Sequence, residues 1–303
     1  MGSDLWSASP AARSVFETAD RALGYSLSDL CFRGPDEKLR DTRYAQPAIL
    51  ATSLACLAAA LESGVVRERP RLMAGHSLGE YSALVAAGAL SLEDGLKLVQ
   101  ERARLMAEAG EKHPGTLAAI LGLDEATVRE VCREAAADVC NLNLPNQTVV
   151  GGTAESVARA MALAKERGAQ RAQELNVSAA FHSRLMAPAA AGLAEAVGRT
   201  TVAPALVPVV ANVTAAPISD AEAIRQELRS QIASPVCWHA SIAVMAAAGI
   251  STFIEFGPGR VLTGMVKRLV PGAALINIGG LRDIAGDEKS GPPERQAIDT
   301  ARA

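Results

Sequence analysis

Apolar positions recur with a helical period in some segments and form short β-branched runs in others. Ser9 before Pro10 predicts the start of a helix that ends near Leu23, and Pro47–Ser63 reads as a helix that is apolar on almost every side. The Ser91–Asp94 segment is a capping box that opens a further long helix. Short strands such as Thr252–Phe256 alternate with these helices, so the pattern predicts an α/β fold.

The pattern changes between residues 112 and 176. The predicted strands and helices follow in the order strand–helix–strand–strand–helix–strand, at Thr116–Leu121, Asp124–Ala136, Asp138–Leu142, Thr148–Gly151, Ala154–Arg167 and Gln170–Leu175. This order is typical of a ferredoxin-like α+β unit. We therefore predict an inserted ferredoxin-like subdomain at 112–176, a discontinuous core at 1–111 and 177–281, and a disordered tail at 282–303, where the sequence is charged and rich in Pro and Gly.

Composition narrows the class of protein. The chain has 303 residues, of which 49% are apolar and only 3% aromatic, with a net charge of −3. The sequence has no strongly basic block, which argues against nucleic acid as a partner. The apolar runs, Ala240–Ile250 among them, look too short to cross a bilayer, and the N-terminus does not read as a signal peptide. We expect no membrane association.

The cysteines point to a reducing compartment. There are five of them, at irregular spacing and without a Cys-x-x-Cys pair. An odd number of scattered cysteines fits reduced thiols better than disulfides or a zinc site. The sequence therefore predicts a cytoplasmic protein without a bound metal.

Gly75-His76-Ser77-Leu78-Gly79 joins a short apolar run to a helical pattern. The Gly-x-Ser-x-Gly pattern between a strand and a helix is typical of a nucleophile elbow, although the pattern by itself also arises by chance. Such a turn exposes the serine hydroxyl at the end of a sheet. The N–H groups at the start of the following helix favour negative charge on that serine.

A nucleophilic serine needs a base, and the chain offers four histidines. His76 is adjacent to the serine and should point away from its hydroxyl, whereas His113 and His239 read as a solvated and a structural residue. His182 lies in the loop where the insert returns to the core, and it is the candidate base. Glu255 is the nearest candidate for a triad acid, and a strand-end capping role explains it equally well. A backbone carbonyl could orient the histidine instead.

Two arginines lie on the helix that follows the elbow. Arg102 and Arg104 are both within the run that begins at Ser91. An arginine on the inner face of a helix is costly unless it meets an anion, and a guanidinium can bind a carboxylate through two hydrogen bonds. The sequence leaves open which of the two faces inward.

Several ordered motifs from Met1 to about Leu281 resemble the malonyl-CoA:acyl-carrier-protein transacylases, including the acyltransferase domains of polyketide synthases. The motifs are Gly75-His-Ser-Leu-Gly-Glu-Tyr-Ser-Ala-Leu-Val-Ala-Ala-Gly88, Gln46-Pro47-Ala, Asn141-Leu-Asn143, Gln147-Thr-Val-Val-Gly-Gly, Phe181-His182-Ser183 and Gly257-Pro-Gly259-Arg-Val-Leu-Thr-Gly-Met. The resemblance implies an α/β-hydrolase-like core with a parallel sheet and an inserted ferredoxin-like α+β subdomain.

The resemblance also assigns roles to residues. It implies that Ser77 is the nucleophile, that His182 is the base, and that the Gln231 backbone carbonyl replaces the triad acid. Leu78 would donate its backbone N–H to the oxyanion, and Arg102 would hold the malonyl carboxylate. The implied substrate-binding set is Arg102, His76, Phe181, Asn141 and Asn143, and Leu78 together with Ala180-Phe181 is similar to malonyl-selecting members.

The implied activity is transfer of malonyl from malonyl-CoA to the phosphopantetheine thiol of an acyl carrier protein, through a malonyl-serine and without a further cofactor. We expect a monomer. An acyl hydrolase of related fold should lack the arginine clamp, and a plain serine esterase would need a triad acid. A third alternative is an N-terminally truncated, low-activity carrier-protein binder.

One family feature is absent from this sequence. Family members open with a strand ending in Gly-Gln-Gly-Ser-Gln, and no such segment stands before Met1. The glutamine of that loop supplies a second backbone N–H to the oxyanion hole, and losing one such donor costs about 100- to 1,000-fold in turnover. We expect the natural chain to start further upstream. The alternative is a chain of low activity.

Overall fold

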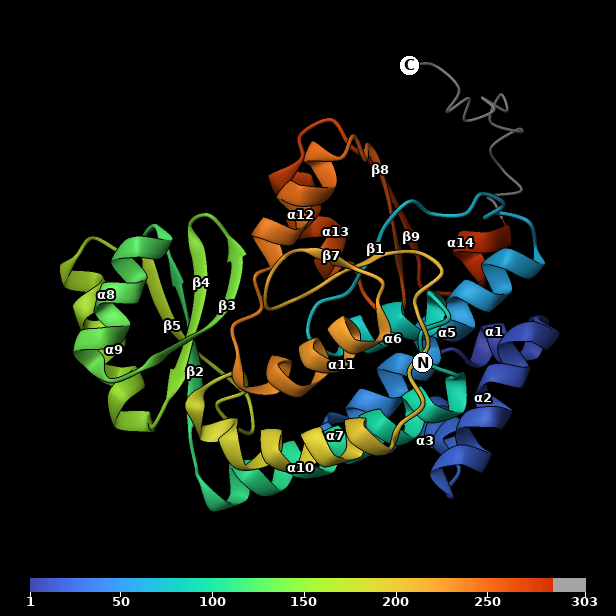
Figure 1. Cartoon of the computed structure of the whole chain (residues 1–303), viewed down its shortest axis with the longest axis horizontal. Helices are drawn as coiled ribbons and strands as arrows, with labels where there is room; N and C mark the ends of the chain where they lie inside the picture. Colours follow the sequence, from blue (N-terminus) through green and yellow to red (C-terminus); the bar gives the residue numbers. More distant parts are fainter. Residues whose placement is uncertain (286–303) are drawn as a thin grey trace.

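The structure is a computed structural model that describes residues 1–285. Its N-terminal part is helical (Figure 1), with α1 Ser3–Ala8, α2 Pro10–Leu23, α3 Leu27–Arg33, α4 Asp36–Arg40 and α5 Thr42–Glu62. The Ser9 hydroxyl accepts the N–H of Ala12 and caps α2, which confirms the predicted helix start. The prediction that α5 starts at Pro47 is wrong, because the Asp41 carboxylate caps the Arg43 N–H and the helix begins at Thr42.

Helix α5 has 21 residues and is long and apolar enough to cross a membrane by length and composition. The expectation that every apolar run is too short is therefore wrong for this helix. Most of its apolar stretch is buried inside the protein, where α5 packs against α2 and α7 (Leu92–Lys112). Burial in the core accounts for its apolar composition.

The core strands form two sheets, and each contains a parallel pair, in agreement with the predicted α/β core. The strands are β1 Met73–Ala74, β6 Val209–Val210, β7 Pro217–Ile218, β8 Thr252–Phe256 and β9 Ala274–Ile278. Strands β1 and β6 pair in parallel, β7 pairs antiparallel with β6, and β8 pairs in parallel with β9. Within residues 1–285 no ladder joins the two sheets. The parallel pairs and their covering helices still make an α/β core.

Further helices of the core pack against these strands or against one another. They are α6 Leu78–Ala86, α7, α10 Ala187–Arg199, α11 Ala221–Ser230, α12 Trp238–Ala247 and α13 Val261–Leu269, with short 3₁₀ turns at Arg184–Met186 and Gln231–Ala233. Apolar residues of β1, β6, β8 and β9 pack in one cluster with α12 and α13. Ser91 caps α7, since its hydroxyl accepts the Asp94 N–H at 3.0 Å. The second bond of a capping box differs, because the Asp94 carboxylate accepts from the Ser91 hydroxyl at 2.7 Å and not from the Ser91 backbone N–H.

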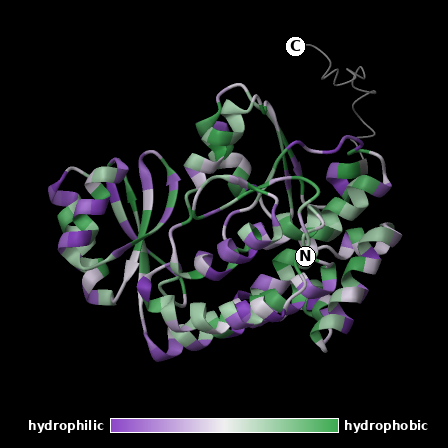
Figure 2. Ribbon diagram, viewed as in Figure 1, coloured by the Kyte–Doolittle hydropathy of each residue, from purple (hydrophilic) through white to green (hydrophobic). Residues whose placement is uncertain are grey.

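The inserted segment folds on one side of the core (Figure 1, green). It contains β2 Thr116–Leu121, α8 Glu125–Ala135, β3 Asp138–Leu144, β4 Gln147–Gly152, α9 Ala154–Glu166 and β5 Arg171–Leu175. The strand order is β3-β4-β2-β5 and all three ladders are antiparallel, which is the ferredoxin-like arrangement. Its two helices are amphipathic (Figure 2), and their apolar sides pack on the sheet in a separate hydrophobic cluster.

The expected disordered tail does not begin at residue 282. Residues Leu281–Ala285 form helix α14. The Asp283 carboxylate accepts the N–H groups of Gly279 and Gly280 at 2.8 and 3.1 Å, and this cap orders the start of the helix. The rest of the predicted tail, 286–303, lies outside the described residues.

Candidate active site

Ser77 lies at the turn between β1 and α6, as a nucleophile elbow requires. Its backbone has φ 52° and ψ −108°, a conformation that a residue other than glycine rarely adopts. Gly75 makes this turn possible, because a Cβ there would lie 2.0 Å from the carbonyl carbon and oxygen of Gly79. The sharp turn places the Ser77 hydroxyl beyond the end of the strand.

The Ser77 Oγ lies 2.7 Å from the His182 Nε2. On the other side of the ring, the Nδ1 lies 3.0 Å from the Gln231 backbone oxygen. A carbonyl oxygen only accepts hydrogen bonds, so Nδ1 carries the proton and Nε2 presents its lone pair to the hydroxyl. This is the tautomer that a general base needs.

Burial keeps the His182 ring neutral. The side chain is 4% exposed, and burial, followed by the nearby Arg102 cation, lowers the pKa of His182 to about 3. At neutral pH the ring is therefore ready to accept a proton. Its backbone also has a positive φ of 63°, so both members of the Ser77–His182 pair have uncommon backbone conformations.

Arg102 is the arginine that faces inward. It is 1% exposed, and its Nη2 donates to the Ser77 Oγ at 3.0 Å and to the Gln231 Oε1 at 3.1 Å. Its Nη1 donates to the Gln46 amide oxygen, and the guanidinium lies 5.3 Å from the Tyr81 ring centroid. Arg104 lies on the outside of the same helix. It forms surface ion pairs there with two glutamates of its own helix.

His76 points away from the Ser77 hydroxyl, as we predicted. Its Nε2 bonds to the Asn143 Oδ1 at 2.8 Å, and its ring packs against Trp238 at 5.6 Å between centroids. Because an amide oxygen accepts, the His76 Nε2 carries the proton. Burial lowers the pKa of His76, so this ring is also neutral. The contact joins the elbow to strand β3 of the insert.

Two other predicted binding residues make no hydrogen bond to Ser77 or His182. Phe181 is half-buried, precedes His182 in the chain and packs against the core. Asn141 lies on β3, where its backbone pairs with Val236 of the core. Its side-chain oxygen is buried and has no hydrogen-bond partner within residues 1–285.

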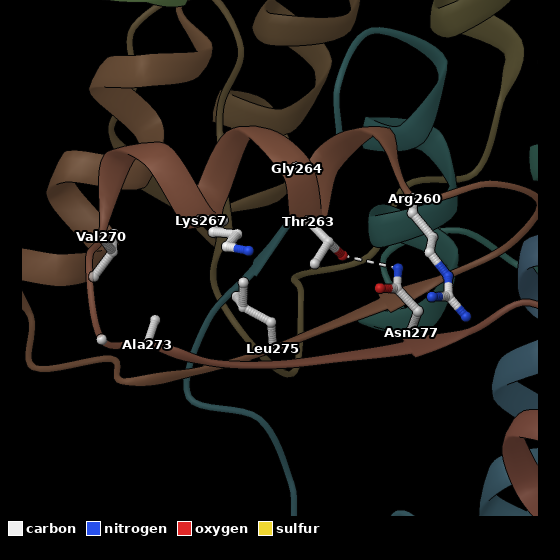
Figure 3. Close-up of a pocket in the computed structure, with 9 residues that line it drawn as sticks. Arg260, Thr263, Gly264, Lys267, Val270, Ala273, Leu275 and Asn277 are labelled. Carbon is white, nitrogen blue, oxygen red and sulfur yellow. Dashed lines mark hydrogen bonds between the residues drawn. The ribbon is translucent and has the colours of Figure 1, made fainter.

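Glu255 does not serve His182. Its carboxylate accepts the Thr263 N–H at 2.7 Å and the Asn277 side-chain N–H at 2.9 Å. It therefore caps the turn into α13, the structural role that the sequence left open. Thr263 and Asn277 border a surface hollow of about 440 Å³ between α13 and β9 (Figure 3). There the Asn277 Nδ2 donates a hydrogen bond to the Thr263 Oγ1 at 2.8 Å.

Sequence reasoning missed a buried polar network behind the elbow. Asn212 follows β6 and accepts the Ser77 N–H at 2.7 Å through its Oδ1. Glu80, on α6, and Glu227, on α11, are 0% and 5% exposed. The one available signal was Glu80, an acidic residue in a helix that is otherwise almost entirely apolar.

This arrangement combines a hydroxyl, a neutral imidazole and a buried cation. The imidazole can take the hydroxyl proton during attack on a carbonyl carbon. The cation beside the hydroxyl favours a substrate that carries an anion close to that carbonyl. The site therefore suits acyl transfer of a carboxylated acyl group.

Comparison with known proteins agrees with this chemistry. Residues 1–276 match the family model described as acyl transferase domain. A malonyl CoA-acyl carrier protein transacylase of Bacillus subtilis is 45% identical over 274 residues, which cover 89% of this chain and 86% of the relative. The protein of that name in Escherichia coli K12 is 42% identical, with 89% and 88% covered.

Solved structures with the same fold include one of a malonyl CoA-acyl carrier protein transacylase from Coxiella burnetii. Its TM-score is 0.89 at 37% identity, with 93% of this chain and 90% of that chain covered. A type II polyketide acyl-carrier protein in complex with its malonyl-transacylase gives a TM-score of 0.89 at 39% identity, with 93% and 92% covered. The chain belongs to the acyl transferase family, and within it to the malonyl CoA-acyl carrier protein transacylases.

Proposed function

We propose that this acyltransferase moves a malonyl group from malonyl-CoA to the phosphopantetheine thiol of an acyl carrier protein. The observation that carries the proposal is that Ser77 Oγ lies within 2.7 Å of the His182 Nε2 and 3.0 Å of the Arg102 Nη2. A nucleophile with a neutral base and a fixed cation fits a malonyl thioester, which has both an electrophilic carbonyl and a carboxylate. Malonyl-CoA is the only small molecule that the proposal requires.

The first half-reaction loads the serine. Ser77 Oγ attacks the thioester carbonyl and its proton passes to the His182 Nε2. The negative charge on the carbonyl oxygen meets the N–H of Leu78, the first residue of α6, where helix N–H groups lack intrahelical acceptors. The C–S bond breaks, and the CoA thiolate takes the proton from His182 as it leaves.

The second half-reaction unloads it. The carrier thiol gives its proton to the His182 Nε2 and attacks the malonyl-serine carbonyl. The ester C–O bond breaks and Ser77 recovers the proton, so the two half-reactions balance without an added acid or base. The Gln231 carbonyl supports the charged ring in both halves, since it holds the Nδ1 proton at 3.0 Å.

Arg102 selects the acyl group in this scheme. Its guanidinium pairs with the malonyl carboxylate, and burial makes that pairing strong because water competes little there. The His76–Asn143 pair, Asn141 and Phe181 would line the approach of the pantetheine arm.

We further infer a cytoplasmic monomer that acts with an acyl carrier protein and contacts neither nucleic acid nor membrane. The cysteines of residues 1–285 are free, and four of them are buried, which suits a reducing compartment. Size-exclusion chromatography with light scattering tests the oligomeric state directly.

Incubation with malonyl-CoA followed by intact mass measurement tests the proposal. The chain should gain one malonyl group, and the Ser77→Ala variant should gain none. Addition of a carrier protein bearing phosphopantetheine should move the adduct to the carrier. Failure of the unaltered chain to form the adduct, or release of malonate alone in the presence of the carrier, would overturn the transferase assignment.

A further inference from the structure

The buried acid Glu80 lies directly behind the reacting groups. It is the third residue of α6 and is completely buried. A buried carboxyl group is costly unless hydrogen bonds satisfy it. Both oxygens of Glu80 accept such bonds, Oε1 from the Asn212 backbone N–H at 2.9 Å and Oε2 from the Gln231 side-chain amide. Glu80 thus joins two segments that are distant in sequence.

Asn212 fixes the backbone of the elbow from both sides. Its Oδ1 accepts the Ser77 N–H and its Nδ2 donates to the Gly75 carbonyl, each at 2.7 Å. These are the two backbone groups on either side of the turn. Holding them favours the uncommon φ of Ser77, which the chain would not adopt unaided.

Gln231 contacts Ser77, Arg102 and His182. Its Nε2 donates to the Ser77 carbonyl at 2.9 Å and its Oε1 accepts from Arg102 at 3.1 Å. Its backbone oxygen accepts from the His182 Nδ1. Rotation of the Gln231 side chain would therefore release Arg102 and one side of the elbow together.

A second carboxyl group, that of Glu227 on α11, lies within hydrogen-bonding reach of Glu80. The Glu227 Oε1 also accepts the Val213 N–H at 2.9 Å. The charged groups that face Glu80 are Glu227 from α11 and Arg102 from α7. Burial first, and then the charge of Glu227, raises the pKa of Glu80, and burial raises that of Glu227. A proton shared between the two carboxyl groups would satisfy both.

From this network we infer that Glu80 is a positioning residue for the acyl-transfer reaction. Its two oxygens accept from the Asn212 backbone N–H and the Gln231 side-chain amide. The side chains of these two residues bond to Ser77 and Arg102, and the Gln231 backbone carbonyl holds His182, so Glu80 keeps the three reacting groups in place. The inference rests on the proposed function for its biological meaning. The reactivity of Ser77, which depends on this geometry, can be measured without malonyl-CoA.

Two substitutions separate positioning from simple packing. Glu80→Gln keeps the size of the side chain but replaces one of its two acceptor oxygens by an NH₂ group. That NH₂ group would face either the Asn212 N–H or the Gln231 amide, both of which are donors, so one of the two hydrogen bonds is lost. Glu227→Gln is the matched control, because its oxygen can still accept from Val213 and its amide can donate to Glu80 as the shared proton does. Both changes remove one buried carboxyl group.

The experiment measures the rate at which phenylmethylsulfonyl fluoride modifies Ser77, by intact mass, with Ser77→Ala as the blank. Glu80→Gln should react about 100-fold more slowly while Glu227→Gln stays within about 3-fold of the unaltered chain. A double-mutant cycle with Asn212→Ala should give clearly less than additive losses, because both changes release the same clamp. If Glu80→Gln fails to fold, Glu80→Asp takes its place, since it is one methylene too short to bridge both partners.

Three results would overturn the inference. The first is a Glu80 variant whose Ser77 reacts within about 3-fold of the rate in the unaltered chain. The second is an equal loss of rate in Glu80→Gln and Glu227→Gln that parallels a fall in Tm. The third is additive losses of rate in the double-mutant cycle. Failure of the malonyl-CoA assay with normal sulfonylation would count against the proposed function and leave the positioning role standing.

Discussion

The Arg102 guanidinium donates a hydrogen bond to the Ser77 hydroxyl oxygen over 3.0 Å. Its other hydrogen bonds within residues 1–285 go to the amide oxygens of Gln46 and Gln231, which are neutral. A buried cation whose acceptors are neutral is incompletely compensated. An incoming carboxylate would complete the compensation, so Arg102 both admits and selects a charged acyl group.

Arg102→Ala should therefore lower kcat/KM for malonyl-CoA by about 100- to 1,000-fold, the range expected for losing charge-assisted hydrogen bonds to a buried carboxylate. Acetyl-CoA, which lacks the carboxylate, should lose far less. Arg104→Ala is the matched control on the outer side of the same helix and should leave both rates unchanged. Equal losses for the two thioesters would contradict this role.

The buried neutral His182 predicts how stability changes with pH. Its pKa is about 3 in the folded chain, against an ordinary 6.5. Between these pH values the unfolded chain binds a proton at His182 that the folded chain does not bind. The free energy of unfolding is therefore highest above pH 6.5 and declines as the pH falls towards 3. The slope from one such group is at most about 1.4 kcal/mol per pH unit.

Comparison with His182→Gln isolates this contribution, since the other titrating groups are common to both chains. The free energy of unfolding, measured with urea between pH 4 and pH 7.5, should fall more steeply with acid for the unaltered chain. Parallel curves for the two chains would show that His182 titrates alike in the folded and unfolded chain, which would contradict the lowered pKa.

The two glycines of the elbow should respond in opposite ways to alanine. A Cβ on Gly75 would lie 2.0 Å from backbone atoms of Gly79, whereas a Cβ on Gly79 would meet nothing within 4 Å. Gly75→Ala should cost about 3 kcal/mol by overpacking and displace Ser77. Gly79→Ala, inside α6, should be neutral or stabilise by up to about 1 kcal/mol. Tm measurements on both variants check this, and equal shifts would contradict it.

Local signals made much of this fold predictable. The caps at Ser9 and Ser91 and the Gly-x-Ser-x-Gly elbow each depend on residues within a few positions of one another, and the structure contains all three. The strand and helix order of the insert was equally readable. Motifs of this kind specify their own conformation, because their hydrogen bonds close within a turn.

Features that depend on long-range packing were out of reach. The sequence could not separate Arg102 from Arg104. Two residues apart on a helix, they point to nearly opposite sides, and only the packing of neighbouring elements decides which side faces inward. Asn212 lies 135 positions from Ser77, with which it bonds, and no pattern joins the two. The division of the core strands into two sheets likewise follows from tertiary pairing.

The last prediction concerns an ion pair that ties the insert to the loop carrying His182. Asp138, at the start of β3, accepts the Arg184 backbone N–H at 3.0 Å and its Nε at 2.9 Å, and Arg184 lies two residues beyond His182. The Arg184 side chain is 61% exposed, so screening weakens the charge–charge part, whereas the bond to the backbone N–H persists.

Asp138→Ala should therefore destabilise the chain by about 1–2 kcal/mol, and Arg184→Ala, which retains the backbone N–H, by less than about 1 kcal/mol. In 1 M NaCl the effect of Arg184→Ala should shrink towards zero, because salt screens exposed charges, while most of the effect of Asp138→Ala should remain. Urea unfolding of both variants at low and high salt measures the difference. Equal effects that vanish together in salt would show that the charges alone hold this junction, since a hydrogen bond to a backbone N–H does not depend on the Arg184 side chain.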